Sequence, residues 1–205
     1  MTELIAHRIN TIEELLKLPE EYGAEVDLRD GLDGRIYMQH DPFTNGEDFE
    51  NFLSKYKHGT LILNIKSERI EFKILQLLER FEINDYFFLD SSFPMIKNLV
   101  DRGEHKIALR FSEYEGLENL EIMKGKVEWV WVDCFNKFPL NRGIEEKIHS
   151  LGYKICVVSP ELQSQPEKIC SYIDLMDKQK IRIEAVCSKE YNIKLWKDAL
   201  ILGSK

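Results

Sequence analysis

Two carboxylates stand two positions apart within residues 23–28, at Glu25 and Asp27. Alternate side chains of an extended strand leave it on the same face, so these two acids would lie side by side. Paired carboxylates can bind a divalent cation or take part in proton transfer. Such a pair is also common on a solvated sheet face. The apolar alternation of Ala24, Val26 and Leu28 favours a strand that packs against helices on one face and points its acids into a barrel.

A hairpin is predicted directly after this strand. Asp33-Gly34 is the strongest short turn signal in the chain, and residues 35–40 would form the returning strand. With residues 33–34 as a two-residue turn, His40 lies directly opposite Asp27, with Cβ atoms about 4.5–5.5 Å apart. A turn at Asp30-Gly31 would break this register. The first arrangement gathers two carboxylates and an imidazole in one local structure.

The rest of the chain alternates strand and helix patterns. Asn10 is predicted to cap the first helix, with Glu13 in the capping-box position. Eight strands followed by helices, in 205 residues, favour an α/β fold, a compact single (β/α)8 TIM barrel with a β-hairpin extension after strand 2. A doubly wound open sheet is the rival, although no Gly-rich phosphate loop follows the first strand. The predicted strands are residues 3–7, 23–32, 60–66, 85–89, 106–110, 128–133, 153–158 and 183–187.

Polar residues gather where these strands end, which is where a barrel carries its chemistry. Two acids and an amide suit a divalent cation, Lys and Arg suit an anion, and two imidazoles suit proton transfer. Strand ends are polar in any barrel, so a single polar residue indicates little. The combination of acids, an amide, cations and imidazoles is what indicates a site. The residues are His7, Glu25, Asp27, Asn64, Lys66, Asp90, Arg110, Asp133 and Ser159.

The composition narrows the classes of partner. A net charge of -8 and a pI near 5.3 disfavour nucleic acid and anionic membranes, because no basic face emerges. The sequence predicts one domain spanning residues 1–205, no membrane span and a cytoplasmic location, and it leaves the oligomeric state unknown. The four cysteines lack metal-site spacing and are predicted to be buried free thiols.

Several ordered motifs in the first hundred residues resemble the glycerophosphodiester phosphodiesterase family, part of the phosphatidylinositol phospholipase C-like phosphodiesterase barrels. The second half of the chain is similar only by pattern. The motifs are Ala6-His7-Arg8, Asn10-Thr11, Gly23-Ala24-Glu25-Val26-Asp27, Asp33-Gly34, His40-Asp41-Pro42, Asn64-Ile65-Lys66 and Ser91-Ser92-Phe93.

The resemblance implies a role for each matching residue. His7 and His40 would be the catalytic acid and base, and Arg8 and Lys66 would bind the phosphate of a small-molecule phosphodiester substrate. A divalent metal, Mg²⁺ or Ca²⁺, would be held by Glu25, Asp27 and Asn64. The chain departs from the family's pattern at Asn64, where the family has a third acid, and at Ile9, where it has a glycine. The large insertion that many members carry between strands two and three is missing.

The implied reaction is metal-dependent cleavage of a glycerophosphodiester-like phosphodiester. One histidine would deprotonate water or a neighbouring substrate hydroxyl, and the other would protonate the leaving alkoxide. Two alternatives stay open, namely a catalytically reduced phosphate-binding barrel protein and a barrel enzyme that acts on a sugar phosphate. The alcohols on either side of the phosphate are not indicated.

Overall fold

The computed structural model describes residues 2–202, and it divides into two compact units. Unit 1 comprises Met1–Ile5 and His105–Lys205, and unit 2 comprises Ala6–Glu104. The single domain predicted over residues 1–205 stays a prediction. Each unit confirms the predicted alternation of parallel strands and helices.

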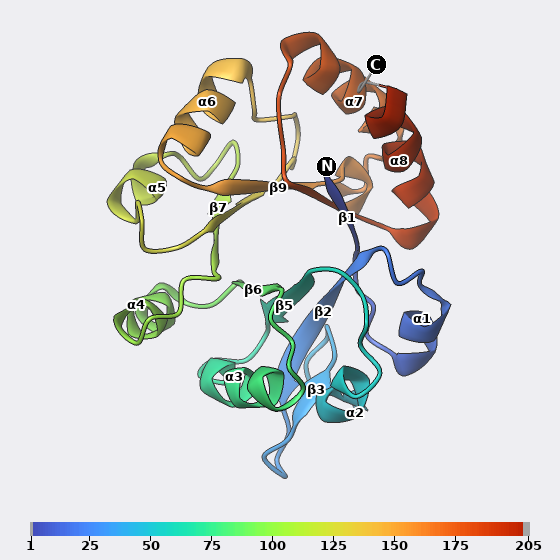
Figure 1. The fold of residues 1–205 in the computed structure, drawn as a ribbon, viewed down its shortest axis with the longest axis vertical. Coiled ribbons are helices and arrows are strands. Elements are labelled where there is room, and N and C mark those ends of the chain that lie inside the picture. Colours follow the sequence, from blue (N-terminus) through green and yellow to red (C-terminus); the bar gives the residue numbers. More distant parts are fainter. Residues whose placement is uncertain (1, 203–205) are drawn as a thin grey trace. The chain divides into compact units, whose positions relative to one another are not determined.

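Unit 2 is built on three parallel strands with a hairpin at one edge. Strand β2 pairs in parallel with β5, which pairs in parallel with β6 (Figure 1). Every residue of β5 is buried, as expected for a parallel strand covered on both faces. The elements are α1 (Ile12–Lys17), β2 (Gly23–Asp30), β3 (Ile36–Met38), β4 (Glu47–Asp48), α2 (Phe49–Leu53), β5 (Leu61–Ile65), α3 (Glu71–Arg80), β6 (Tyr86–Leu89) and α4 (Phe93–Asp101).

The helices of unit 2 bury one apolar face each. In α3, Ile74, Leu77 and Leu78 are spaced three and four residues apart and are buried. The hydroxyl of Ser92 caps α4 by accepting from the Met95 N–H. Such packing fixes the loops after β5 and β6, from which polar side chains extend.

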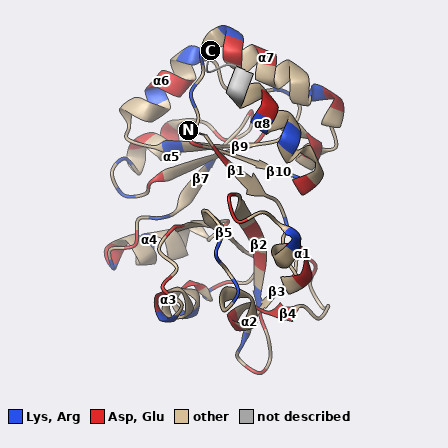
Figure 2. Cartoon of the chain, turned by 45° about the vertical axis from the view of Figure 1, so that its right-hand side comes forward, with Lys and Arg blue, Asp and Glu red and all other residues tan. Residues whose placement is uncertain are grey.

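Unit 1 repeats this arrangement with parallel strands β7 to β10 in sequence order, and β1 lies beside β10. Acidic and basic residues are interspersed along α6, α7 and α8 (Figure 2), as on solvated helix faces. The elements are β1 (Glu3–Ala6, of which residues 3–5 belong to unit 1), β7 (Ala108–Phe111), α5 (Glu118–Ile122), β8 (Trp129–Val132), α6 (Arg142–Ser150), β9 (Lys154–Val158), the 3-10 turns Pro160–Gln163 and Pro166–Lys168, α7 (Ile169–Gln179), β10 (Ala185–Ser188), the 3-10 turn Glu190–Asn192 and α8 (Ile193–Leu202).

The hairpin after β2 is present, but its predicted register is wrong. Leu28 pairs with Met38 and Asp30 pairs with Ile36 across the antiparallel β2–β3 ladder. The connection spans residues 31–35 and is closed by hydrogen bonds from the Gly31 N–H to the Arg35 carbonyl and from the Gly34 N–H to the Gly31 carbonyl. This longer loop shifts the ladder by one residue compared with a two-residue turn. His40 is therefore not directly opposite Asp27.

Two further expectations need correction. Helix α1 is capped by Thr11, whose side chain and that of Glu14 form the capping box, so Asn10 and Glu13 do not have those roles. The cysteines are free thiols as predicted, but Cys170 is exposed, whereas Cys134, Cys156 and Cys187 are buried. Among the helices of residues 2–202, none has the length and apolar character needed to cross a bilayer.

Candidate active site

The paired acids of β2 lie in the interior of unit 2. Glu25 and Asp27 are both 0% exposed. Asp27 is in register with Asn64 on the neighbouring parallel strand β5. The Asn64 amide donates a hydrogen bond of 2.7 Å to Glu25 Oε1, and Asn64 is itself buried. The three residues predicted as metal ligands therefore come together, because two adjacent strands present them side by side.

The loop after β1 contributes the next contacts to Glu25. The Arg8 backbone N–H donates to Glu25 Oε2 at 2.7 Å, and His7 Nε2 lies 3.7 Å from the same oxygen. Arg8 has a φ of 57°, in the left-handed region that few non-glycine residues adopt. This turn places the imidazole of His7, the N–H of Arg8 and the guanidinium of Arg8 around the acidic pair.

Burial has a large effect on Glu25. It raises the pKa of the Glu25 carboxyl to about 7, from an ordinary value of 4.5, and the negative charge of Asp27 adds to the rise. The hydrogen bonds from Asn64 and from the Arg8 N–H oppose the rise, as does the nearby charge of Lys66. When no divalent metal ion is bound beside it, the Glu25 carboxyl can therefore gain or lose a proton near neutral pH.

Asp27 is held by an asparagine that sequence reasoning missed. Asn10 donates its amide to Asp27 Oδ2 at 2.9 Å, and its amide oxygen accepts from the Asp27 backbone N–H at 2.9 Å. This two-way clamp fixes the position of Asp27 on the strand. The Thr11-Ile12-Glu13-Glu14 sequence was the available signal, because a Thr cap with an acid three residues on leaves Asn10 free for another task.

Cationic groups lie around the same carboxylate. Arg8 Nε is 3.6 Å from Asp27 Oδ2, and Lys66 Nζ is 3.5 Å from Asp27 Oδ1. Lys66 Nζ is also 3.5 Å from Asp90, one of the polar strand-end residues singled out in the sequence, which has a φ of 62°. Because the Lys66 side chain is 19% exposed, its ammonium can still meet a ligand from solvent.

The backbone of His40, and not its ring, is hydrogen-bonded to residues near the acidic pair. The Gln39 N–H donates to the Asp27 carbonyl at 2.8 Å, so the neighbouring residue is tied to β2. The Arg29 guanidinium donates to the His40 carbonyl at 2.9 Å and to the Lys66 carbonyl at 3.0 Å. The His40 ring lies 2.7 Å from the Asp41 carboxylate and is 39% exposed. Within residues 2–202, the observed hydrogen bonds and ion pairs do not join this ring directly to Glu25 or Asp27.

The donor set fits a hard divalent cation. Asn64 Oδ1 and Asp27 Oδ1 are buried acceptors that receive no hydrogen bond, and the Glu25 carboxylate lies beside them. Carboxylate and amide oxygens are the ligands that Mg²⁺ and Ca²⁺ prefer. In the described part of the chain, no cluster of three or more His, Cys, Asp or Glu residues could hold a metal. The third oxygen at this site would accordingly come from an amide.

The strand-end residues of unit 1 form their own network. Arg110 contacts Asp133, which also accepts hydrogen bonds from Trp131 Nε1 at 3.3 Å and from the Gln163 amide at 3.4 Å. Burial raises the pKa of the Asp133 carboxyl, and the nearby Arg110 opposes that rise. These groups satisfy one another within unit 1.

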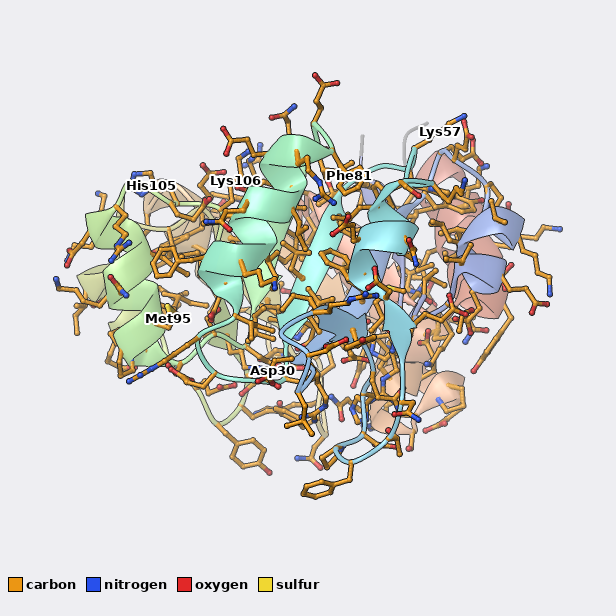
Figure 3. The ribbon with its side chains drawn as sticks, turned by 90° about the horizontal axis from the view of Figure 1, so that it is seen from below. Asp30, Lys57, Phe81, Met95, His105 and Lys106 are labelled. Atoms are coloured by element: carbon orange, nitrogen blue, oxygen red, sulfur yellow. The ribbon has the colours of Figure 1, made fainter. Side chains whose placement is uncertain are left out.

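The site in unit 2 lies where the strands end. In Figure 3, Asp30 at the carboxyl end of β2 is at the opposite end of unit 2 from Lys57 and Phe81, which precede β5 and β6. Carboxyl ends of parallel strands form one edge, and this edge carries a proton-transfer group, two cations and an acidic pair with an amide. Such a set can bind a phosphate anion and move a proton to or from it.

Comparisons with known proteins identify the fold. No protein-family model matches the sequence, and no curated protein matches it. Among solved structures, a glycerophosphodiester phosphodiesterase from Agrobacterium tumefaciens strain C58 matches with a TM-score of 0.65 and 14% identity, over 92% of this chain and 97% of that one. A glycerophosphoryl diester phosphodiesterase from Parabacteroides distasonis matches with a TM-score of 0.69 and 12% identity, over 98% and 87%.

The same comparison also finds an enzyme of another class. A mutant tryptophan synthase α-subunit from Pyrococcus furiosus matches with a TM-score of 0.60 and 12% identity, over 99% of this chain and 95% of that one. These neighbours have TIM-barrel-like folds, as predicted for this sequence. Sequence identities of 12–14% show that this chain shares the fold of these proteins, but they do not show that it shares their reactions, since one fold hosts many reactions. The chain therefore has the fold of the glycerophosphodiester phosphodiesterases that it matches.

Proposed function

We propose that the protein is a metal-dependent phosphodiesterase that cleaves a glycerophosphodiester-like substrate by acid-base catalysis with His7 and His40. The observation that carries this proposal is the convergence on buried Glu25 and Asp27 of an imidazole, two cations and an amide. The solved structures of this fold that are named as glycerophosphodiester phosphodiesterases support it.

Each residue has a task in this proposal. Arg8 and Lys66 bind the non-bridging phosphate oxygens, which favours entry of the anion and stabilises the charge that grows during cleavage. His7 lies next to Glu25, whereas the His40 ring is 39% exposed and lies beside Asp41. One imidazole deprotonates the nucleophile, either water or a neighbouring substrate hydroxyl, while the other protonates the leaving alkoxide. An imidazole can act either as a proton acceptor or as a proton donor near neutral pH.

Glu25, Asp27 and Asn64 would hold the divalent cation, Mg²⁺ or Ca²⁺. When bound, such an ion neutralises charge on the phosphate and supports attack at phosphorus. Asn10 fixes the Asp27 carboxylate from behind, as partners of ligand side chains commonly do.

The proposal is tested by phosphodiester turnover with and without a chelator. Bis-p-nitrophenyl phosphate and glycerophosphocholine should both be cleaved with Mg²⁺ or Ca²⁺ present, and EDTA should lower the rate by about 10²-fold or more, since a Lewis-acid ion contributes several kcal/mol. Excess Mg²⁺ should restore it. A protein that is inert towards a broad phosphodiester panel but binds phosphate would be a phosphate-binding barrel protein. Isomerisation of a sugar phosphate would instead indicate a barrel enzyme that acts on sugar phosphates.

Replacing Asn64 with Asp should tighten binding of the divalent cation. The substitution adds an anionic oxygen where a neutral amide now meets Glu25, and an added charge-assisted contact of about 1–3 kcal/mol corresponds to about 10–100-fold in the dissociation constant. Calorimetric titration with Mg²⁺ and Ca²⁺ measures the change. An Asn84→Asp variant serves as the control, because Asn84 is exposed, lies outside the candidate site and donates to the Glu82 carbonyl. Absence of binding in both the wild type and Asn64→Asp would contradict the metal assignment.

A further inference from the structure

Asp90 directly follows strand β6 and has no task in the reaction proposed above. Leu89, the last residue of β6, is in register with Asn64 on β5, so Asp90 lies beside the segment that leads from Asn64 to Lys66. Asp90 Oδ2 is 3.5 Å from Lys66 Nζ, which is also 3.5 Å from Asp27 Oδ1. The Lys66 ammonium is therefore within ion-pair distance of two carboxylates.

The backbone sets the position of Asp90. Its φ of 62° lies in the left-handed region, which Asp adopts more readily than most residues because its short side chain can form local hydrogen bonds. The loop is anchored two residues later, where Ser92 Oγ donates to Glu68 Oε1 at 2.6 Å and accepts from the Met95 N–H at 3.4 Å. Contacts of Lys66 with Asp90 and of Glu68 with Ser92 thus join the loops that follow β5 and β6. This connection at two points holds the Asp90 carboxylate at Lys66.

The two carboxylates around Lys66 differ in the tasks open to them. The Asp27 side chain is 1% exposed and belongs to the donor set proposed for the divalent cation, so a bound cation would share its charge. The Asp90 side chain is 22% exposed and is not part of that set. With the cation bound, Asp90 is therefore the carboxylate that balances the charge of Lys66. Solvent screens this pair only in part, because the Lys66 side chain is 19% exposed.

The substrate and the product of a phosphodiesterase differ in charge. A diester carries one negative charge. Hydrolysis adds water across one P–O ester bond and releases one alcohol and a phosphate monoester, whose second pKa of about 6 makes it nearly doubly charged at neutral pH. Arg8 and Lys66 alone would bind the doubly charged product more tightly than the substrate. A carboxylate beside Lys66 repels each unit of ligand charge, so it weakens binding of the product more than binding of the substrate.

We propose that Asp90 is a specificity-determining residue, which makes this site select singly charged phosphate esters over doubly charged ones and favours release of the monoester after cleavage. The inference rests on the proposed phosphodiesterase function and assigns one residue to the discrimination between its substrate and its product. Asp90 acts through Lys66 and through its own charge, and it takes no part in bond cleavage.

The test compares the binding of two ligands that differ by one methyl group and one charge, dimethyl phosphate and monomethyl phosphate. At pH 8, with Mg²⁺ present, phosphorus NMR titrations give both dissociation constants without any turnover. Asp90→Asn should tighten binding of the monoester about tenfold more than binding of the diester, since one unit of charge at a partly screened site is worth about tenfold in a binding constant. Asn suits the positive φ at residue 90, which protects the loop from added strain.

A second variant separates the charge from the shape of the loop. Asp90→Gly also removes the carboxylate and suits a positive φ, so it should shift the ratio of the two dissociation constants in the same direction and by about the same factor. A damaged loop would weaken both ligands in parallel and leave that ratio unchanged. The matched control is Asp101→Asn, which removes a carboxylate that pairs with Lys97 on α4, outside the site. It changes the net charge equally and should keep the wild-type ratio.

The charge assignment is overturned if the ratio stays unchanged in both Asp90 variants, or if Asp101→Asn shifts it equally. Absence of binding of both ligands to the wild type and to Asp90→Asn would overturn it as well. Calorimetric titration with Mg²⁺ should give nearly the same affinity for the wild type and Asp90→Asn. A loss of about tenfold or more would make Asp90 a metal ligand instead and would remove the proposed role.

Turnover decides the phosphodiesterase function separately. In an active protein, inhibition of diester cleavage by monomethyl phosphate should become about tenfold stronger in Asp90→Asn. Cleavage without any shift in the ratio of dissociation constants would leave the phosphodiesterase function standing and overturn the role of Asp90. An inert protein that shows the shifted ratio would keep the charge selection by Asp90 while the catalytic proposal fails.

Discussion

Replacing either His7 or His40 with Asn is expected to lower phosphodiester turnover by about 10²–10⁴-fold, the usual worth of one positioned proton-transfer group. Both residues lie outside the apolar core, His7 beside Glu25 and His40 on an exposed loop, so the fold should persist. Circular dichroism and the thermal unfolding midpoint verify this. Steady-state rates with saturating Mg²⁺ measure the effect.

The double variant should cost far less than the product of the two single effects, because residues that act as a unit are not additive. The pH profile of turnover should be bell-shaped, with two apparent values that belong to the pair. His105→Asn is the control, since His105 is exposed and its ring contacts the Lys126 carbonyl. Turnover that persists after loss of both imidazoles would show that they are not the acid and base.

Glu25 should make the metal-free protein less stable as pH rises. Its pKa is about 7 in the folded chain and ordinarily 4.5, so between these values the folded protein keeps a proton that the unfolded chain has released. The stabilising contribution is fully present below pH 4.5 and is lost as pH rises through about 7. A shift of this size corresponds to about 3 kcal/mol in the free energy of unfolding. Urea unfolding in EDTA, from pH 4 to pH 8, measures it.

Glu25→Gln removes the titration. The difference in unfolding free energy between this variant and the wild type should shift by about 3 kcal/mol in favour of the variant as pH rises from 4.5 to 7.5. Glu13→Gln is the matched control, because Glu13 is exposed and its pKa is lowered by its contact with Lys17. Parallel pH profiles for the wild type and Glu25→Gln would contradict the raised pKa.

The elements could be predicted where burial dictates them. Leu61–Ile65, apolar except for Asn64, and Trp129–Val132 have the composition that buried parallel strands need, and the structure places a strand at each. Boundaries were less accurate where short polar segments compete for structure. Within residues 45–57 only Phe49–Leu53 is helical, because Glu47 and Asp48 pair with β3 before it. That pairing depends on a partner strand, which local sequence does not reveal.

The acidic residues of the candidate site could be predicted from the sequence, but the hairpin register and the hydrogen bonds of Asn10 could not. Spacing alone placed Glu25 and Asp27 on one face, and the next strand brought Asn64 to them. The hairpin register was not predictable in this way, because it follows from the longer loop of residues 31–35, which the hydrogen bond from the Gly31 N–H to the Arg35 carbonyl closes. Asn10 was missed for a similar reason, since its partner Asp27 lies 17 positions away in the sequence.

The hydrogen bonds from the Arg29 guanidinium to two backbone carbonyls affect which substitutions this protein can tolerate. A carbonyl belongs to the main chain, so it survives any substitution at residues 40 and 66. During evolution, the side chains at these two positions can be exchanged while the segments that carry them keep their course. Loss of Arg29 would have the opposite effect, because it would release both segments while leaving their side chains intact. Descendants of this chain with a new chemistry would therefore retain the arginine longer than His40 or Lys66.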